Sequence, residues 1–196
     1  MEIEPRTATA DDLAGVTDTL ARSFHDDPLM AWCYPDEATR PRRLTTMWHL
    51  LAEGLYLPGG VSTTLPDHDA VALWRHPDDD RQESFWAENT ERFITLMEGD
   101  LARMGEVSEL MGEHHPTERH WYLLAIGVKP EAQGRGLGSV LMAHTLEVID
   151  QRGEPAYLEA TSPRGRTLYE RFGFEVTAEL VPEGGPPMWP MWREPT

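Results

Sequence analysis

The sequence predicts a single mixed α/β domain, and three observations support this prediction. Apolar residues at helical spacing alternate along the chain with short apolar runs typical of strands. The chain has 196 residues, about one domain in length, with 40% apolar residues and no evident repeat or linker. A glycine-rich loop lies where a central apolar run gives way to a helical pattern. We therefore treat residues 1–196 as one domain.

The first 60 residues predict a short strand and two helices. A strand over residues 3–7 precedes a capping-box pattern from Thr9 to Asp12, which begins a helix. Asp27-Pro28 ends this helix, because the residue before a proline avoids the α conformation. The apolar positions of the two helices are Leu13, Val16, Leu20 and Phe24, and then Leu44, Met47, Trp48, Leu51 and Leu55.

The middle of the chain predicts two strands, a long helix and a loop. Residues 61–65 and 70–74 read as strands around a turn at 66–69. A helix then follows, weakened at Gly99, and residues 105–119 are expected to form a loop. The apolar positions of that helix are Trp86, Phe93, Met97, Leu101 and Met104.

The last third predicts a strand over 121–128, a helix from Leu137 to about Arg152 and a strand over 156–160. Ser162 is a suitable N-cap for another helix, with Pro163 at the first position and Gly173 beyond the end. Residues 174–181 and 188–192 read as closing strands. The apolar face expected for the 137–152 helix comprises Leu137, Val140, Leu141, His144 and Val148, with His144 as a core residue.

Composition argues against several classes of protein. A net charge of −17 opposes nucleic-acid binding, which needs a basic surface. No run approaches the roughly 20 apolar residues of a membrane span. Residues 1–12 carry acids and no apolar stretch, so we expect no signal peptide. Cys33, the single cysteine, excludes intrachain disulfides. We expect a soluble cytoplasmic protein, a monomer or homodimer, with neither nucleic-acid nor membrane partners.

The charge is distributed unevenly. Residues 129–171 contain six basic and six acidic residues, so the rest of the chain carries the whole −17. An anion can enter the neutral block, while a cation is drawn toward the remainder. That the acidity only maintains solubility is an equally open interpretation.

The glycine-rich motif is Gln133-Gly134-Arg135-Gly136-Leu137-Gly138, followed by Ser139 and the helix. The first N–H groups of a helix lack intrahelical partners and carry partial positive charge, so an anion can bind where side chains are absent. The third glycine comes too early for a dinucleotide fingerprint, and the Lys-Ser/Thr of a nucleotide P-loop is missing. The motif therefore predicts a site for another phosphorylated ligand.

Two motifs together resemble the GNAT superfamily of N-acetyltransferases. They are the glycine loop after Ile126-Gly127-Val128 and the segment Leu168-Tyr169-Glu170-Arg171-Phe172-Gly173-Phe174, about thirty residues later. Residues 70–193 further resemble the puromycin N-acetyltransferase branch, whereas the first 60 match loosely. The resemblance implies a mixed, mostly antiparallel sheet flanked by helices, with central strands splayed around the cofactor. Residues 119–196 would form the acetyl-CoA-binding half and residues 1–118 the acceptor-side half.

The resemblance also implies acetyl-CoA as co-substrate, with no metal. Backbone N–H groups from about Gly134 to Ser139 would bind its pyrophosphate, and the 126–128 backbone would pair with its pantetheine arm. Relatives usually carry a cofactor-binding asparagine where this chain has Gly165, so either cofactor affinity is lower here or Arg164 or Arg166 supplies the missing contact. The cofactor residues implied are Ile126, Gly127, Val128, Gln133, Gly134, Arg135, Gly136, Leu137, Gly138, Ser139 and Tyr169.

Acetyl transfer to an amine needs a neutral nucleophile and a stabilised thiolate. Tyr169 matches the family tyrosine near the thioester sulfur, although it also suits a packed helix face. Glu159 is a candidate base or a support for the next helix. His120 is a second candidate base, with a surface strand end as the alternative. Adjacent His114 and His115 point apart and lack companion ligands, so we expect no metal there.

The acceptor site is the least defined. Phe24, Asp27, Trp32 and Tyr34 combine aromatic rings with a carboxylate and suit an ammonium group, although ordinary packing explains them equally well. Tyr122 is a further pocket or core residue. The leading hypothesis is direct acetyl transfer from acetyl-CoA to the primary amine of a small molecule, with antibiotic-like compounds among the candidates. A peptide or protein N-acetyltransferase and a non-catalytic acyl-CoA-binding regulatory module are the alternatives.

Overall fold

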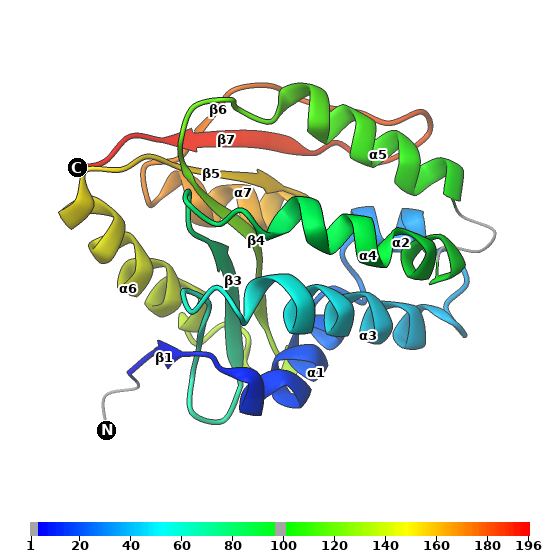
Figure 1. The fold of residues 1–196 in the computed structure, drawn as a ribbon, viewed down its shortest axis with the longest axis horizontal. Helices are drawn as coiled ribbons and strands as arrows, with labels where there is room; N and C mark the ends of the chain where they lie inside the picture. The colour runs from blue at the N-terminus through cyan, green and yellow to red at the C-terminus, as the bar shows by residue number, and fades with distance from the viewer. Residues whose placement is uncertain (1–3, 97–100) are drawn as a thin grey trace.

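The computed structural model describes residues 4–96 and 101–196, which form an open seven-stranded sheet between two layers of helices (Figure 1). The strand order is β1-β2-β3-β4-β5-β7-β6, and β4–β5 is the parallel pair in an otherwise antiparallel sheet. The predicted mixed, mostly antiparallel sheet is therefore confirmed. The strands are β1 (Arg6–Thr7), β2 (Thr63–Thr64), β3 (Ala70–Arg75), β4 (Trp121–Val128), β5 (Ala156–Ala160), β6 (Glu175–Val176) and β7 (Trp189–Arg193).

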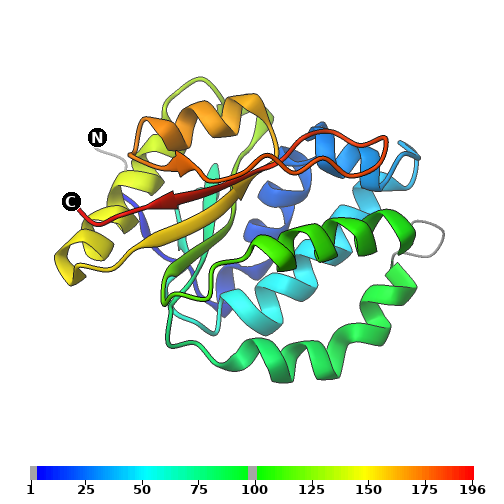
Figure 2. The same cartoon turned by 90° about the horizontal axis from the view of Figure 1, so that it is seen from above.

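The helices divide between the two faces of the sheet (Figure 2). One face carries α1 (Leu13–Ser23), α2 (Pro28–Cys33), α3 (Arg40–Leu51), α4 (Arg81–Leu96) and α5 (Leu101–His114), and the other carries α6 (Leu137–Arg152) and α7 (Pro163–Glu170). Short 3-10 segments are η1 (Ala10–Asp12) and η3 (Pro130–Ala132), while α3 continues into a π-helical segment, η2 (Ala52–Tyr56). Each helical layer covers its own hydrophobic core.

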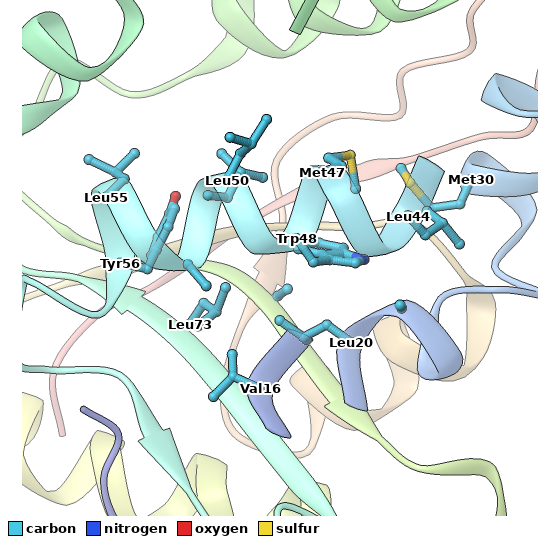
Figure 3. Close-up of a cluster of buried hydrophobic side chains, with 14 of the residues drawn as sticks. Val16, Leu20, Met30, Leu44, Met47, Trp48, Leu50, Leu55, Tyr56 and Leu73 are labelled. Carbon is cyan, nitrogen blue, oxygen red and sulfur yellow. The ribbon is translucent and has the colours of Figure 1, made fainter. Parts of the chain in front are cut away.

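Strand alternation supplies both cores from the same elements. Val71 and Leu73 of β3 face α1 and α3, whereas Ala72 and Trp74 face α6, because successive side chains of a strand point to opposite faces. In the first core Trp48 of α3 lies among buried side chains of α1 and β3 (Figure 3). Each such side chain contributes roughly 1.5–3 kcal/mol of hydrophobic free energy.

The segment after the first helix differs from the prediction. The preceding helix, α1, already ends at Ser23, and Asp27-Pro28 instead begins α2: the Asp27 carboxylate accepts the N–H groups of Leu29 and Met30, and Pro28 takes the first helical position. The sequence pattern predicted the end of one helix and not the start of another. A short helix of six residues leaves too little apolar periodicity to be recognised on its own.

The loop predicted over residues 105–119 is wrong, because α5 continues to His114. Gly105 and Gly112 weaken the helical pattern locally, yet Val107 is buried against the first core and the surrounding residues are good helix formers. Tertiary packing therefore overrides the glycine signal. Met97 and Gly99 lie outside the described residues, and of the predicted strand over 3–7 the structure describes Arg6–Thr7 as a strand.

The predicted bounds of β4, β5 and the 137–152 helix are confirmed, but the buried face of α6 agrees with the prediction only at Leu137 and Leu141. His144 and Val148 are exposed, whereas Met142, Thr145 and Ile149 are buried. Apolar residues occur on most sides of this helix, so its amphipathic face is poorly marked in the sequence. Of the closing segments, Glu175–Val176 and Trp189–Arg193 are strands, and Leu180 forms an isolated bridge with Met188.

The central strands separate where the site lies. β4 and β5 pair only from Trp121 to Leu123, and the two strands diverge beyond that point. A bulge at Leu124 shifts the register with β3 and re-aims the second half of β4. This half therefore presents an edge that β5 does not cover. The predicted splay of the central strands is present in the fold.

Candidate active site

A cavity of about 660 Å³ opens at this separation. Its walls come from the end of α1, the α1–α2 turn, the free half of β4, the glycine loop and α7. Predicted residues at its lining are Phe24, Asp27, Ile126, Val128, Gln133, Gly134, Gly136, Leu137, Gly138, Ser139 and Tyr169. Those predicted but absent from the lining are Trp32, Tyr34, His120, Tyr122, Gly127, Arg135 and Glu159.

The glycine loop exposes backbone at the start of α6. Gly134 and Gly136 adopt φ values of 79° and 78°, in the left-handed region that favours glycine. A Cβ built on either would meet nothing within 4 Å, so the backbone there is open to a ligand. Gly136 is the N-cap of α6 and has no side chain to occupy the first N–H groups. These residues fit a bound pyrophosphate group.

Two neighbouring side chains are held by the protein itself. Arg135 pairs with Asp69 at 3.4 Å and does not line the cavity. Gln133 donates to the carbonyl of Val128 at 3.2 Å and accepts from Arg164 at 2.8 Å. Arg164 therefore lies at the cavity wall beside Gly165. Arg166, the other arginine proposed to replace the missing asparagine, is bound to Glu170 at 2.7 Å.

The edge of β4 is already partnered at its last residue. The Val128 N–H donates to the Ser23 hydroxyl at 3.1 Å, and its carbonyl accepts from Gln133. Gly127 brings α1 close, since a Cβ there would lie 3.0 Å from Leu20. An added strand formed by a pantetheine arm would have to displace the Ser23 and Gln133 side chains at Val128. Ile126, which lines the cavity, is the remaining predicted pairing residue.

Tyr169 lines the cavity from α7 and is buried. Its ring contacts Phe174 edge-on with 6.1 Å between centroids, so the packing role and the cavity position coexist. Burial raises the pKa of Tyr169 above the usual value for a phenol, and the charge of Asp27 raises it further. The hydroxyl therefore stays protonated and can act as a hydrogen-bond donor.

Asp26 and Asp27 are the carboxylates at the cavity, and Asp27 is the less exposed of the two. Oδ1 of Asp27 accepts the N–H groups of Leu29 and Met30 at 3.0 and 3.1 Å, and Oδ2 accepts the hydroxyl of Thr161 at 2.7 Å. Burial raises the pKa of Asp27, although these hydrogen bonds act in the opposite direction. A carboxylate offers about four acceptor positions, so Oδ2 retains one for a ligand.

The other aromatic residues of this segment pack within the protein. Phe24 contacts Trp48 with 5.0 Å between ring centroids while also lining the cavity. Trp32 lies under the Arg103 guanidinium at 5.4 Å, and Tyr34 is almost fully buried. Phe24 and Asp27 of this segment therefore line the cavity, as an acceptor site requires, whereas Trp32 and Tyr34 pack within the protein.

Glu159 lies outside the cavity lining, in a second group of polar side chains that it forms with His115, His120, Tyr122 and Tyr157. Tyr122 donates its hydroxyl to Oε2 of Glu159 at 2.9 Å, and His115 Nδ1 lies 3.6 Å from Oε1. Burial raises the pKa of Tyr122 well above its usual value, with Glu159 adding to the shift. Burial also lowers the pKa of His120, whose Nδ1 lies 2.6 Å from the Glu118 carbonyl.

His115 was missed as a partner of Glu159 by sequence reasoning. It follows α5, some 40 residues before β5, and its pairing depends on how that helix packs. The signal in the sequence is His115 next to Pro116, a pair that belongs to the resemblance with the puromycin branch but indicates no carboxylate partner. Within residues 4–96 and 101–196 no group of three or more histidine, cysteine or acidic side chains is placed to hold a metal ion. No helix in that part is long and apolar enough to cross a bilayer.

Comparison with known proteins gives a family match and several relatives. The model of the Acetyltransferase (GNAT) family matches residues 61–174. An N-acetyltransferase of Schizosaccharomyces pombe, described as uncharacterized, is 25% identical over 177 residues, covering 84% of this chain and 71% of that protein. A mycothiol acetyltransferase of Streptomyces coelicolor is 31% identical over 149 residues. That match covers 63% of this chain but only 45% of the relative.

Solved structures agree with the fold. One from Corynebacterium glutamicum, described as histone acetyltransferase HPA2 and related acetyltransferase, has a TM-score of 0.75 at 28% identity, covering 100% of this chain and 98% of that one. Arylalkylamine N-acetyltransferase 2 of Aedes aegypti has a TM-score of 0.64 at 16% identity, covering 100% of both chains. At that identity the second comparison shows a shared fold alone.

Proposed function

The chain belongs to the GNAT family of acetyltransferases, and we propose that it transfers an acetyl group to the primary amine of a small molecule. Acetyl-CoA is the family's co-substrate and supplies the acetyl thioester. The observation that supports this proposal most is the cavity itself. It joins an exposed helix N-terminus, suited to pyrophosphate, to a protonated tyrosine and a carboxylate.

The carboxylates suit a cationic acceptor. Aliphatic amines are mostly protonated at neutral pH, so an acceptor amine arrives as an ammonium ion and must lose a proton. Asp27 is proposed to bind the ammonium group at the cavity. Thr161, which bonds to Asp27, comes two residues after Glu159. Two residues of extended chain span about 7 Å, which places Glu159 near this wall of the cavity although it does not line it, so we propose that the acceptor amine approaches Glu159 from the Asp27 side.

Glu159 is proposed as the proton acceptor and Tyr169 as the donor of a hydrogen bond to the departing thiolate. The raised pKa of Tyr169 favours a hydrogen bond that strengthens as charge develops over full proton transfer. His120 stays the alternative base, since burial holds it in its neutral form. In this proposal residues 1–118 supply the acceptor side, through Asp27, and residues 119–196 supply the cofactor side.

The identity of the acceptor is also a proposal. The relatives include mycothiol acetyltransferases and the sequence resembles the puromycin branch, so an amino group on a sugar- or nucleoside-like molecule is a reasonable first acceptor. The single buried cysteine is consistent with the proposed cytoplasmic location.

The test is thermal shift with acetyl-CoA followed by thiol release with a panel of amines. At one hundred times its Kd, acetyl-CoA should stabilise the fold by about 2.7 kcal/mol, roughly 5 to 10 °C in a domain of this size. Aminonucleosides, arylalkylamines, polyamines and a lysine peptide should then be compared. Tyr169→Phe should retain the thermal shift and lose turnover.

Each part of the result has a distinct meaning. Absence of any shift would contradict the acetyl-CoA site. A shift without turnover on any amine would favour the non-catalytic module. Turnover confined to the lysine peptide would favour protein acetylation. Full activity of Tyr169→Phe on every accepted amine would remove Tyr169 from the mechanism.

A further inference from the structure

We propose that His115 carries the acceptor's proton from Glu159 to solvent. This inference rests on the proposed acetylation of an amine, in which Glu159 takes up that proton. His115 acts through Glu159, so it is a positioning residue and not a catalytic one.

The two carboxylate oxygens of Glu159 differ in their partners. Oε2 accepts the Tyr122 hydroxyl at 2.9 Å, whereas Oε1 is buried without a hydrogen-bond partner among the described residues. The nearby Tyr157 hydroxyl is likewise buried and makes no hydrogen bond within 3.5 Å there, although Glu159 lies close enough to raise the pKa of Tyr157 further than burial alone does. Leaving buried polar atoms unpaired costs free energy, and such groups often have a functional role. An ammonium group has the donors to satisfy both atoms.

His115 faces the same unpaired oxygen. Its Nδ1 lies 3.6 Å from Oε1 of Glu159, within ion-pair range. The His115 side chain is 30% exposed, while that of Glu159 is 3% exposed. His115 thus reaches from solvent to a carboxylate that water does not touch directly. Histidine is also the side chain whose charge changes most readily near neutral pH.

The imidazole is held in position by the rings around it. It meets Tyr122 and Tyr157 nearly edge-on, with centroids 5.1 and 4.9 Å away, and it lies 5.0 Å from the His120 ring. The charged and titratable groups that face it are therefore Glu159 and Tyr157 from β5, Tyr122 from β4 and His120 just before β4. Beyond Tyr122, the Arg75 guanidinium of β3 covers that ring at 5.4 Å.

His120 is less suited to the same task. Its Nδ1 is engaged by the Glu118 carbonyl at 2.6 Å, and its ring contacts Tyr157 and Trp192. Of the two histidines, His115 is the one that lies within ion-pair distance of Glu159. The geometry therefore distinguishes the two histidines.

The proton balance is simple. The ammonium loses one proton to Oε1 of Glu159, which leaves a neutral amine and a carboxylic acid. The acid passes this proton to Nδ1 of a neutral His115, 3.6 Å away, after a small side-chain movement or through one water, and becomes a carboxylate again. The imidazolium releases a proton from its exposed side to water or buffer, so the pair is restored for the next cycle.

The test compares His115→Ala and His115→Asn with the wild type on two acceptors. One is the best strongly basic amine from the panel, and the other is an analogue whose ammonium pKa lies well below the assay pH. We expect kcat for the basic amine to fall at least tenfold in both variants, with a changed pH profile. The weakly basic analogue, already neutral, should lose less than twofold. Added imidazole should restore much of the lost rate in His115→Ala.

His114→Ala is the matched control. His114 is exposed, precedes His115 and contacts only the Leu110 carbonyl through Nδ1 among its described hydrogen bonds, so its kcat should be unchanged. Thermal unfolding of each variant separates misfolding from proton transfer. Equal losses on both amines, an unchanged pH profile or no effect of imidazole would overturn the role of His115. A wild type that acetylates no amine would instead contradict the proposed function.

Discussion

At the scale of single residues, Asp27 joins structure to chemistry. Its carboxylate caps α2, bonds to Thr161 after β5 and faces the cavity. Burial raises the pKa of Asp27, so the folded protein binds this proton more tightly than the unfolded chain does. The resulting stability is complete below the ordinary aspartate pKa of about 3.9 and is lost as pH rises through the raised value. Above that raised pKa the ionised group therefore costs stability.

Asp27→Asn separates these roles, because asparagine is also a good N-cap but has no charge. We expect the Tm at pH 7.5 to stay the same or rise, while kcat/KM for a cationic amine falls at least about tenfold. Thermal melts and steady-state rates measure both effects. Asp26→Asn is the comparison: Asp26 also lines the cavity, but its side chain is 93% exposed, so solvent screening should limit its effect to about twofold. An Asp27→Asn enzyme with wild-type kcat/KM would exclude Asp27 from acceptor binding.

Sequence reasoning reached some site residues and missed others for clear reasons. The glycines and Tyr169 lie in contiguous motifs whose spacing is visible in the sequence, and the structure brings them to one cavity. His115 and Thr161 act through pairings across more than 40 residues, which no local pattern reports. Trp32 and Tyr34 have suitable chemistry, but their orientation was decided by packing against Arg103 and the first core.

At the scale of elements, α6 has left-handed glycines at both ends. Gly136 precedes its first turn, and Gly153 follows its last with φ of 65°. A residue with a Cβ costs roughly 1–2 kcal/mol in this conformation. Of the two glycines, only Gly136 lines the cavity. A substitution should therefore strain the backbone equally at both positions but lie near the ligand only at Gly136.

Gly136→Ala and Gly153→Ala should therefore both lower the Tm by a few degrees. Only Gly136→Ala should also weaken acetyl-CoA binding, because its methyl group projects from the exposed backbone of the loop. Calorimetry gives the Kd of each variant directly. If both variants bind acetyl-CoA with wild-type affinity, the start of α6 is not the pyrophosphate site.

The elements also show where sequence patterns are reliable. β4, β5 and α6 were bounded correctly by strong apolar runs and glycine signals. The buried face of α6 was not predicted correctly, because this helix is apolar on most sides. The extent of α5 was not predicted either, because the helix contains glycines and is stabilised by packing against the first core. Local sequence therefore located these elements better than it oriented them.

At the scale of the whole molecule, the net charge of −17 coexists with arginines at the cavity, Arg22, Arg164 and Arg171. An anionic co-substrate meets local positive charge, while a cationic acceptor experiences the field of the remaining acids. At saturating acetyl-CoA, raising salt from 20 to about 300 mM should lower kcat/KM severalfold for a dicationic acceptor, because the screening length shortens. A weakly basic amine should be nearly unaffected. Equal salt dependence for both would show that net charge does not guide the acceptor.

The position of β7 has a consequence for synthesis. This last strand in chain order inserts between β5 and β6 and pairs with both. Its Arg193 also ties to Asp150 of α6, 2.7 Å away. On the ribosome, the α1–α5 layer emerges early, but β5 keeps an uncovered edge until residues 189–193 are translated. The edge of β5 is thus covered only once residues 189–193 have been made, and nascent chains released earlier would expose an edge prone to aggregation.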